Sequence, residues 1–231
     1  MPGWRCWRRR LPRRSSRRCD RVQADQLKEH IGRSLAEVVS YADELRDLDQ
    51  ALGDGDLGIT VTLGAEAVIE ALSVLPESAT PAEIARECAK AFANANPSTM
   101  AALVAGGLLA GSKVWTDLTE ITVADAARFT RAAGENIAKR GKTELGDKTI
   151  LDTIMPAADA LDQASDGASG LAAAIAGAER AVVDTTPLQS RRGRASWLQE
   201  RSIGLQDPGA TAFLRFLESW RATSDEQHAS I

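Results

Sequence analysis

Three aspartates lie close together in a short glycine-rich segment, residues 48–58. Asp49, Asp54 and Asp56 are separated by five and by two residues, and the glycines between them allow tight turns and close approach to a ligand. Clustered carboxylates repel one another unless a cation neutralises them, and oxygen-only ligands favour hard ions such as Mg²⁺ or Ca²⁺. The segment therefore predicts a divalent-metal site. It lacks the EF-hand spacing, and an acidic surface turn with helix-capping aspartates is the alternative.

A second group of candidate residues lies in the segment 185–209, which has no hydrophobic pattern. Arg191, Arg192 and Arg194 stand there among small residues, and guanidinium groups bind phosphate oxygens bidentately. The segment ends in an acid followed by Pro-Gly-Ala, which indicates a helix N-terminus whose N–H groups can hold an anion. A solvated charged loop explains the arginines equally well. Together with a metal turn, however, the segment predicts a nucleotide-binding loop or lid.

A third segment, residues 140–149, reads R-G-K-T-E-L-G-D-K-T. It resembles half of a phosphate loop, but the Walker spacing is not met and no strand precedes it. Its other interpretation is a helix–helix connection, in which Gly146-Asp147-Lys148 caps the next helix. His30 and His228 are isolated in the sequence, and no Ser-His-Asp or Cys-His arrangement is present.

The elements that must position these residues are helices. From Val22 onward apolar residues recur at helical spacing, and the aromatic content of 4% disfavours a sheet. Pro156 predicts a kink or a start inside its helix. Eight helices with no convincing strand predict an all-α single domain, over residues 22–47, 59–74, 81–95, 100–115, 122–140, 148–164, 168–184 and 210–222.

Charge divides the chain into two parts. Residues 1–21 contain nine arginines and one acid, a net charge of +8, whereas residues 22–231 carry 19 basic and 31 acidic residues, a net charge of −12. We expect residues 1–21 to be a disordered tail, which is explained by a mis-assigned start, a solvated tail, a targeting peptide or a nucleic-acid arm. Nucleic-acid binding is disfavoured because the acidic domain, residues 22–231, would repel the same polyanion.

Composition also bounds the location of the protein. No apolar run reaches the roughly 18 to 20 residues of a membrane-spanning helix. Three cysteines, Cys6, Cys19 and Cys88, match neither a disulfide framework nor a zinc site. We therefore expect a cytoplasmic protein without a membrane segment.

Three motifs in this order resemble the nucleotide-binding L subunit or domain of the dihydroxyacetone kinase family, over about residues 23–220. They are L-D-x-x-x-G-D-G-D-x-G, R-G-K-T-E-L-G-D-K-T-I-L-D and G-R-A-S-W-L-Q-E-R-S-I-G-L-Q-D-P-G-A. The resemblance implies an up-and-down barrel of eight antiparallel helices that encloses a nucleotide and Mg²⁺ site at one end.

The resemblance also implies roles for individual residues. Asp49, Asp54 and Asp56 match aspartates that hold two Mg²⁺ ions against the phosphates of ADP or ATP, and Arg194 matches a nucleotide contact that also assists catalysis. The remaining nucleotide contacts would be Leu57, Gly58, Ile59, Thr60, Ser98, Thr99, Gly141, Ile150, Asp207, Pro208 and Gly209.

Two departures from the family pattern bear on the substrate. Leu57 stands where the family usually has histidine, and Asn96-Pro97-Ser98-Thr99-Met100 replaces a Gly-Gly-x-Ser-Gly phosphate loop. They leave the phosphate-loop geometry and the acceptor sugar open.

By this resemblance the chain is a kinase subunit. It would transfer a phosphoryl group to dihydroxyacetone, or to a related short ketose, held on a separate K subunit. The donor is either exchangeable ATP or a resident ADP that a phosphohistidine carrier of the sugar phosphotransferase system rephosphorylates. A homodimer or hetero-oligomer is expected. The alternative is a non-catalytic nucleotide-binding partner of a regulatory protein.

Overall fold

Apolar residues at helical spacing form long helices over most of the described part of the chain. The computed structural model describes residues 21–229, and within them lie nine α-helices, two 3₁₀ helices and two short strands. In chain order they are β1 Val22–Gln23, α1 Ala24–Val38, η1 Val39–Tyr41, α2 Ala42–Leu52, α3 Leu57–Ser73, α4 Pro81–Ala95, α5 Thr99–Val114, β2 Glu120–Ile121, α6 Val123–Gly141, α7 Leu151–Gln163, α8 Gly167–Thr185, η2 Arg194–Ser202 and α9 Pro208–Ala229. The all-α fold class is confirmed. The predicted tail, residues 1–21, lies outside the described residues except for Arg21.

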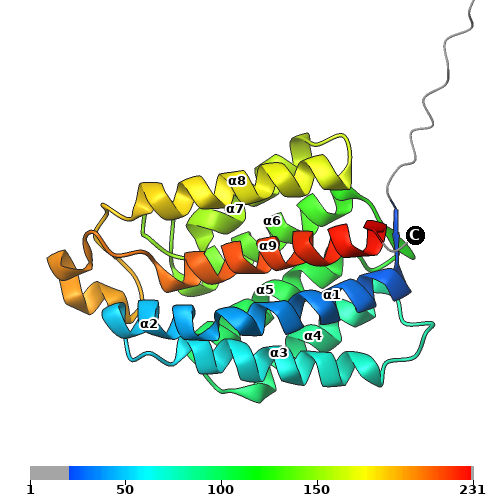
Figure 1. Ribbon diagram of the computed structural model, residues 1–231, viewed down its shortest axis with the longest axis horizontal. Helices are drawn as coiled ribbons and strands as arrows, with labels where there is room; N and C mark the ends of the chain where they lie inside the picture. Colours follow the sequence, from blue (N-terminus) through cyan, green and yellow to red (C-terminus); the bar gives the residue numbers. More distant parts are fainter. Residues whose placement is uncertain (1–20, 230–231) are drawn as a thin grey trace, which may run out of the picture.

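The helices form a closed ring. From α2 onward each helix packs against the next along the chain, and α9 packs against both α8 and α1. α1 and α2 follow one another through η1, and both contact α3 and α9, so they act as one rod. Eight rods then close the ring, with neighbours running in opposite directions (Figure 1). This confirms the predicted up-and-down barrel of eight antiparallel helices.

The alternation of direction determines what meets at each end of the barrel. The N-termini of α3, α5, α7 and α9 lie at the same end, together with the C-terminus of α2 and with η2 (Figure 1, left). β1 and β2 lie at the opposite end, where Val22 pairs with Ile121 and Arg21 forms an ion pair with Glu120. Helix N-termini bear partial positive charge, so the first end is suited to anions.

Several boundaries differ from the sequence predictions. The helix predicted over residues 22–47 is interrupted by η1, where the Ser40 hydroxyl donates to the Glu37 carbonyl at 2.7 Å, a contact that competes with helical bonding. It then continues to Leu52, because Leu45 and Leu52 are both buried. The expectation of no strand was wrong at the two-residue strands β1 and β2.

Three further differences lie near the arginines. The helix predicted from residue 148 begins at Leu151, because Lys148 has a φ of +62°, which a helix excludes. The helix then contains Pro156 rather than starting at it. The patternless segment 185–209 contains η2, and α9 runs from Pro208 to Ala229 rather than over residues 210–222.

Small residues let the helices approach closely. Gly64 of α3 faces Phe92 of α4, whose Cε2 lies 2.3 Å from where a Cβ on Gly64 would stand. One buried cluster, formed by Val38, Leu45, Leu57 and Val61, lies beneath the turn between α2 and α3. Such packing explains how a chain poor in aromatic residues builds a core.

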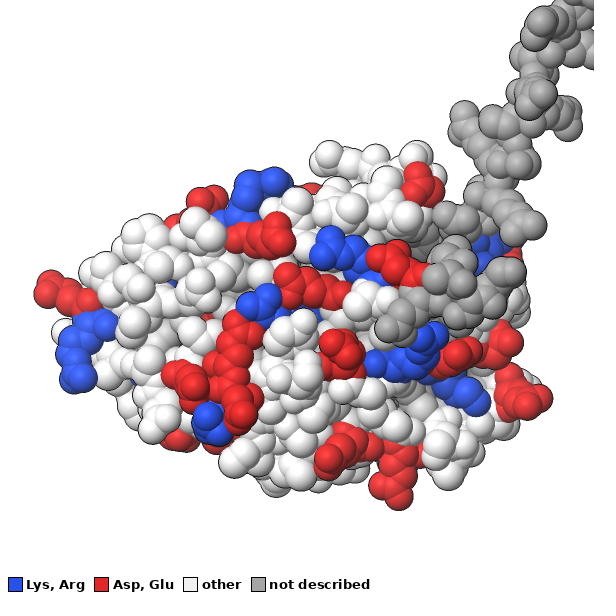
Figure 2. Space-filling model, viewed as in Figure 1, with Lys and Arg blue, Asp and Glu red and all other residues white. Residues whose placement is uncertain are grey.

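No described helix has the length and apolar character needed to cross a membrane. On the face shown in Figure 2, acidic and basic side chains are interspersed rather than separated by sign.

Cys88 is buried, and burial raises the pKa of its thiol to about 12, so this thiol is unreactive at neutral pH.

Candidate functional site

The three aspartates of the first motif meet in the turn between α2 and α3. Asp49 lies in the last turn of α2, Asp54 in the turn and Asp56 just before α3, and one carboxylate oxygen of each lies within 4.8 Å of the others. Gly55 has a φ of +76°, a backbone conformation that favours glycine. The structure thus brings together the side chains that the sequence singled out.

The electrostatics of this aspartate cluster (Asp49, Asp54 and Asp56) favour a cation. Burial, and then the negative charge of Asp49, raise the pKa of Asp56 above its ordinary value. Arg194 of η2 approaches the cluster from the far part of the chain, forming an ion pair with Asp54 and placing Nη2 3.2 Å from Oδ1 of Asp56. Asp49 Oδ2 also accepts the Leu57 N–H at 3.1 Å.

The first turn of α3 contains four predicted phosphate contacts, residues 57–60. A Cβ on Gly58 would stand 2.2 Å from the Ala42 carbonyl oxygen, so α2 and α3 approach closely only with glycine here. Ile59 is exposed, whereas Leu57 is 5% exposed and belongs to the cluster beneath the turn. The Leu57 side chain therefore faces the core, and its N–H is already engaged by Asp49.

The N-terminus of α5 lies beside that of α3. Ser98 caps α5, its hydroxyl accepting the Ala101 N–H at 3.0 Å, and Thr99 is the first helical residue. The Asn96 amide donates to the Thr60 hydroxyl at 2.9 Å. The sequence departure at Asn96 thus links the two helix N-termini, which together offer N–H groups to an anion.

The remaining predicted contacts lie at the end of α6, which is Gly141, and at the starts of α7 and α9. A Cβ on Gly141 would lie 3.7 Å from a methyl of Leu103, and one on Gly209 would lie 3.5 Å from Cβ of Ile150. Pro208 is buried at the first position of α9. This group therefore borders on α5, α7 and α9.

Asp207 precedes α9 and is buried. Its Oδ2 accepts the Ala210 N–H at 2.7 Å, as an N-cap residue does. Burial raises its pKa to about 7; Asp152 adds to the rise, whereas Lys148 and the helix N–H groups oppose it. This side chain is thus held by the fold.

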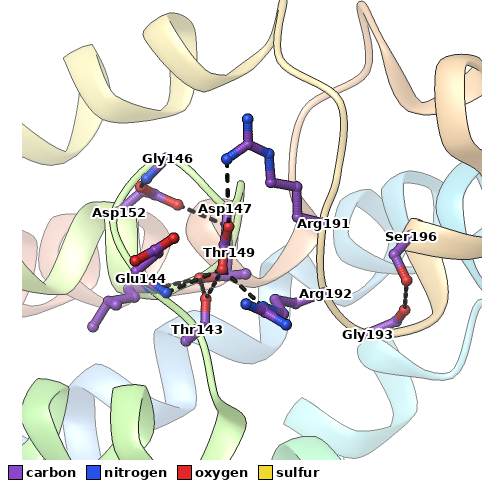
Figure 3. A network of polar contacts seen from close by, with 11 residues as sticks. Thr143, Glu144, Gly146, Asp147, Thr149, Asp152, Arg191, Arg192, Gly193 and Ser196 are labelled. Atoms are coloured by element: carbon purple, nitrogen blue, oxygen red, sulfur yellow. Dashed lines mark hydrogen bonds and ion pairs between the residues drawn. The ribbon is translucent and has the colours of Figure 1, made fainter.

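Sequence reasoning missed the role of Asp147. Its side chain is 1% exposed, and Oδ2 accepts Arg192 Nε at 2.8 Å and the Glu144 N–H at 3.1 Å (Figure 3). Burial works to raise the pKa of Asp147, but these bonds and the charges of Arg192 and Arg191 outweigh it and hold the pKa below its ordinary value. The buried carboxylate is therefore charged, with hydrogen bonds to Oδ2 and a 3.9 Å ion pair from Arg191 to Oδ1.

The sequence analysis also did not predict the buried contacts of Lys148. It is 1% exposed, and its Nζ donates to the carbonyls of Thr186 at 3.0 Å, Leu188 at 2.9 Å and Ser202 at 2.7 Å. Burial lowers its pKa, and the charge of Asp207 opposes that shift. These partners lie 38 to 54 residues further along the chain, so no local pattern indicates them.

Comparison with known proteins assigns the fold and the motifs to one family. The family model described as the DAK2 domain matches residues 51–222, so the chain belongs to that family. It is 37% identical over 173 residues to the PEP-dependent dihydroxyacetone kinase 1, ADP-binding subunit DhaL, of Listeria innocua, covering 72% of this chain and 79% of that protein. It is 30% identical over 178 residues to the corresponding DhaL subunit of Escherichia coli, covering 75% and 84%. The resemblance to nucleotide-binding L subunits is thereby confirmed.

A solved structure supports the same fold. The dihydroxyacetone kinase from C. freundii, in complex with AMP-PNP and Mg²⁺, superposes with a TM-score of 0.68 at 18% identity, covering 96% of this chain and 38% of that one. The barrel is thus shared, as predicted.

Proposed function

We propose that this chain is the ADP- or ATP-binding subunit of a kinase for dihydroxyacetone or a related short ketose. The observation that carries the proposal is the aspartate cluster, which faces Arg194 at the barrel end where four helix N-termini meet. Membership in the family of DhaL subunits supports a kinase role. The finer roles below follow from the chemistry of the side chains.

The donor set of the aspartate cluster fits Mg²⁺. It consists of carboxylate oxygens alone, which hard divalent ions prefer, and one oxygen of each carboxylate lies within 4.8 Å of the others. We infer that Asp49, Asp54 and Asp56 hold two Mg²⁺ ions. Bound there, the ions would neutralise phosphate oxygens of the nucleotide.

The protein groups around the cluster would orient the nucleotide. The N-termini of α3 and α5 would offer the N–H groups of Gly58, Ile59, Ser98 and Thr99 to its phosphates. Leu57 and Thr60, whose N–H groups are bonded to Asp49 and Asp56, would flank them. The adenine would lie near Gly141, Ile150 and the start of α9. Arg194, half-exposed beside Asp54 and Asp56, would turn to the transferred phosphoryl group and stabilise its charge.

The acceptor would be held by a partner. Ketose binding is assigned to a separate K subunit, which makes a hetero-oligomer the working assembly, with a homodimer of this chain as the other arrangement. The donor is ATP, or a phosphohistidine carrier that recharges resident ADP. Both versions use the same metal site, in a cytoplasmic protein that does not bind nucleic acid.

The direct test is to purify the chain, denature it and measure released nucleotide by anion-exchange chromatography. Stoichiometric ADP would support the carrier-fed version, and an empty site that binds added Mg-ATP would support the ATP-dependent one. Absence of binding in both experiments would overturn the kinase function. Binding without phosphoryl transfer to any K-bound ketose would favour a nucleotide-sensing partner of a regulator.

A further inference from the structure

Arg194 lies on a segment that has no buried apolar side chain to fix its position. This segment, residues 186–206 between α8 and α9, is here called the arginine loop. It is described throughout, and its buried residues are two serines, Ser190 and Ser202. Its position must therefore be set by polar contacts.

Lys148 supplies contacts on both sides of Arg194. Its ammonium binds the carbonyls of Thr186 and Leu188, before Arg194, and of Ser202, after it. Two bonds across the base of the loop accompany them, from the Gly204 N–H to the Thr186 carbonyl and from the Ser190 N–H to the Ser202 hydroxyl, both at 2.9 Å. The two ends of the loop thus converge on one buried charge.

Asp147 holds the arm of the loop that leads to Arg194. Its carboxylate binds the Arg192 side chain at 2.8 Å, and its backbone carbonyl accepts the Arg191 N–H at 3.0 Å (Figure 3). Gly193, with a φ of +65°, then turns the chain before Arg194. Side chain and backbone of one residue therefore fix the two positions that precede this turn.

Lys148 cannot serve as a phosphate ligand, although its motif resembles half of a phosphate loop. An ammonium has three donors, and all three are used within the protein. At 1% exposure the side chain also has no access to a ligand. Its positive charge acts on the protein alone.

We propose that Asp147 and Lys148 are positioning residues, which set the arginine loop so that Arg194 stands over the aspartate cluster. The inference rests on the proposed function for its consequence, which is the rate of phosphoryl transfer. Neither side chain touches the aspartates or a ligand. Their effect passes through the backbone of the loop.

The first experiment measures hydrogen exchange of the loop amides without any ligand. Lys148→Met keeps the length of the side chain but leaves three carbonyls without their donor, and Asp147→Asn removes the charge that holds Arg192. Both should raise exchange over residues 186–203 by about tenfold or more, while the core of α4 and α5 stays protected. Lys142→Met, at an exposed lysine of the same connection, is the matched control and should leave exchange unchanged.

The second experiment couples the loop to Arg194. With wild-type Arg194, Asp147→Asn and Lys148→Met should lower kcat by about tenfold or more and leave Mg-nucleotide affinity within about twofold. With Arg194→Met already present, the same changes should lower kcat no further, because the group they position is gone. Full additivity would show a merely structural role and overturn the inference.

The outcomes separate this inference from the proposed function. If the wild-type chain binds no Mg-nucleotide, the proposed function fails, whereas the exchange result stands on its own. If wild-type binding and transfer are normal and both variants match wild type in exchange and kcat, this inference alone fails. Should Lys148→Met unfold the chain, Asp147→Asn provides the same test.

Discussion

Two ion clusters at the same end of the barrel use the same residue types in opposite surroundings. In the buried cluster, Asp147 and Lys148 are each 1% exposed, and Asp147 Oδ2 and Lys148 Nζ are hydrogen-bonded within the protein. In the open cluster, the side chains of Asp54, Asp56 and Arg194 are 50%, 42% and 43% exposed.

The difference in burial indicates which of the two clusters can bind a ligand. A buried charge is stable only when its bonding capacity is met, so the buried cluster has nothing left for a ligand. The open cluster retains free lone pairs and a side chain able to move. Residue type alone would not distinguish them, because each contains aspartate and a cation.

The largest effect is expected when the positive charge of the open cluster, the Arg194 side chain, is removed. Arg194→Met should lower kcat by about a thousandfold, because a single arginine that stabilises a transferred phosphoryl group has effects of that size. Mg-nucleotide affinity should change much less. The measurement is steady-state phosphoryl transfer with a K subunit, and Arg201→Met, an exposed arginine of the same 3₁₀ helix, is the control. Equal activity of Arg194→Met and Arg201→Met would contradict the assignment.

Removing one ligand of the open cluster should abolish its metal dependence. Asp54→Ala should weaken Mg-dependent nucleotide binding by about a hundredfold, because even outer partners of metal ligands contribute 10- to 100-fold. Isothermal titration with Mg²⁺ and with EDTA measures it. Asp43→Ala, an exposed aspartate of α2, should bind as wild type does. Unchanged binding in Asp54→Ala would disprove the metal site.

A third prediction concerns Asp207, a buried carboxyl group near Lys148, and uses the pH dependence of stability. Its pKa of about 7 lies above the ordinary value of 3.8, so the folded state binds the proton more tightly than the unfolded state. The contribution of Asp207 is therefore fully present below about pH 4 and is lost as the pH rises to about 7.

Asp207→Asn should keep the helix cap and lose this dependence. The free energy of unfolding of this variant, relative to that of wild type, should rise by roughly 3 kcal/mol between pH 4.5 and pH 8. Urea unfolding at both pH values measures the difference. A constant difference across this range would show that Asp207 does not titrate there.

The smallest expected effect lies outside both clusters. Gly32 stands within α1, and a Cβ there would meet no atom within 4 Å. Gly32→Ala should therefore raise the free energy of unfolding by about 0.5–1 kcal/mol through helix propensity. Thermal unfolding measures it, and nucleotide affinity should stay the same, which separates general stability from the site.

Local patterns predicted the all-α class and the clustering of the three aspartates, whereas the barrel arrangement came from the family resemblance. Helical spacing of apolar residues is a property of neighbours in sequence, and it indicated the eight rods of the ring. The three aspartates lie within eight residues of one another along the chain, so a glycine-rich turn was enough to expect them together. Their approach to Arg194 was not visible in the spacing and came from the family resemblance.

What the sequence did not reveal depends on distant partners. Lys148 and Ser202 are 54 residues apart, and Asp147 and Arg192 are 45 residues apart. No residue pattern in either member of a pair indicates that it contacts the other. The left-handed backbone at Lys148, where φ is +62°, was not indicated by the sequence either, because it is uncommon for a residue other than glycine. Leu57 was predicted to contact the nucleotide, but burial against Leu45 and Val61 directs its side chain inward.

The short ladder of β1 and β2 marks the end of the barrel at which a label or a surface can be attached. Arg21 directly precedes β1 and pairs with Glu120 of β2, and this ladder lies at the barrel end opposite the turn between α2 and α3. The two ends are separated by about 33 Å, the length of the 22-residue helix α9 at about 1.5 Å per residue. A fluorophore or a sensor surface joined at Arg21 would thus leave the aspartate end facing the solution, open to nucleotide and partner alike.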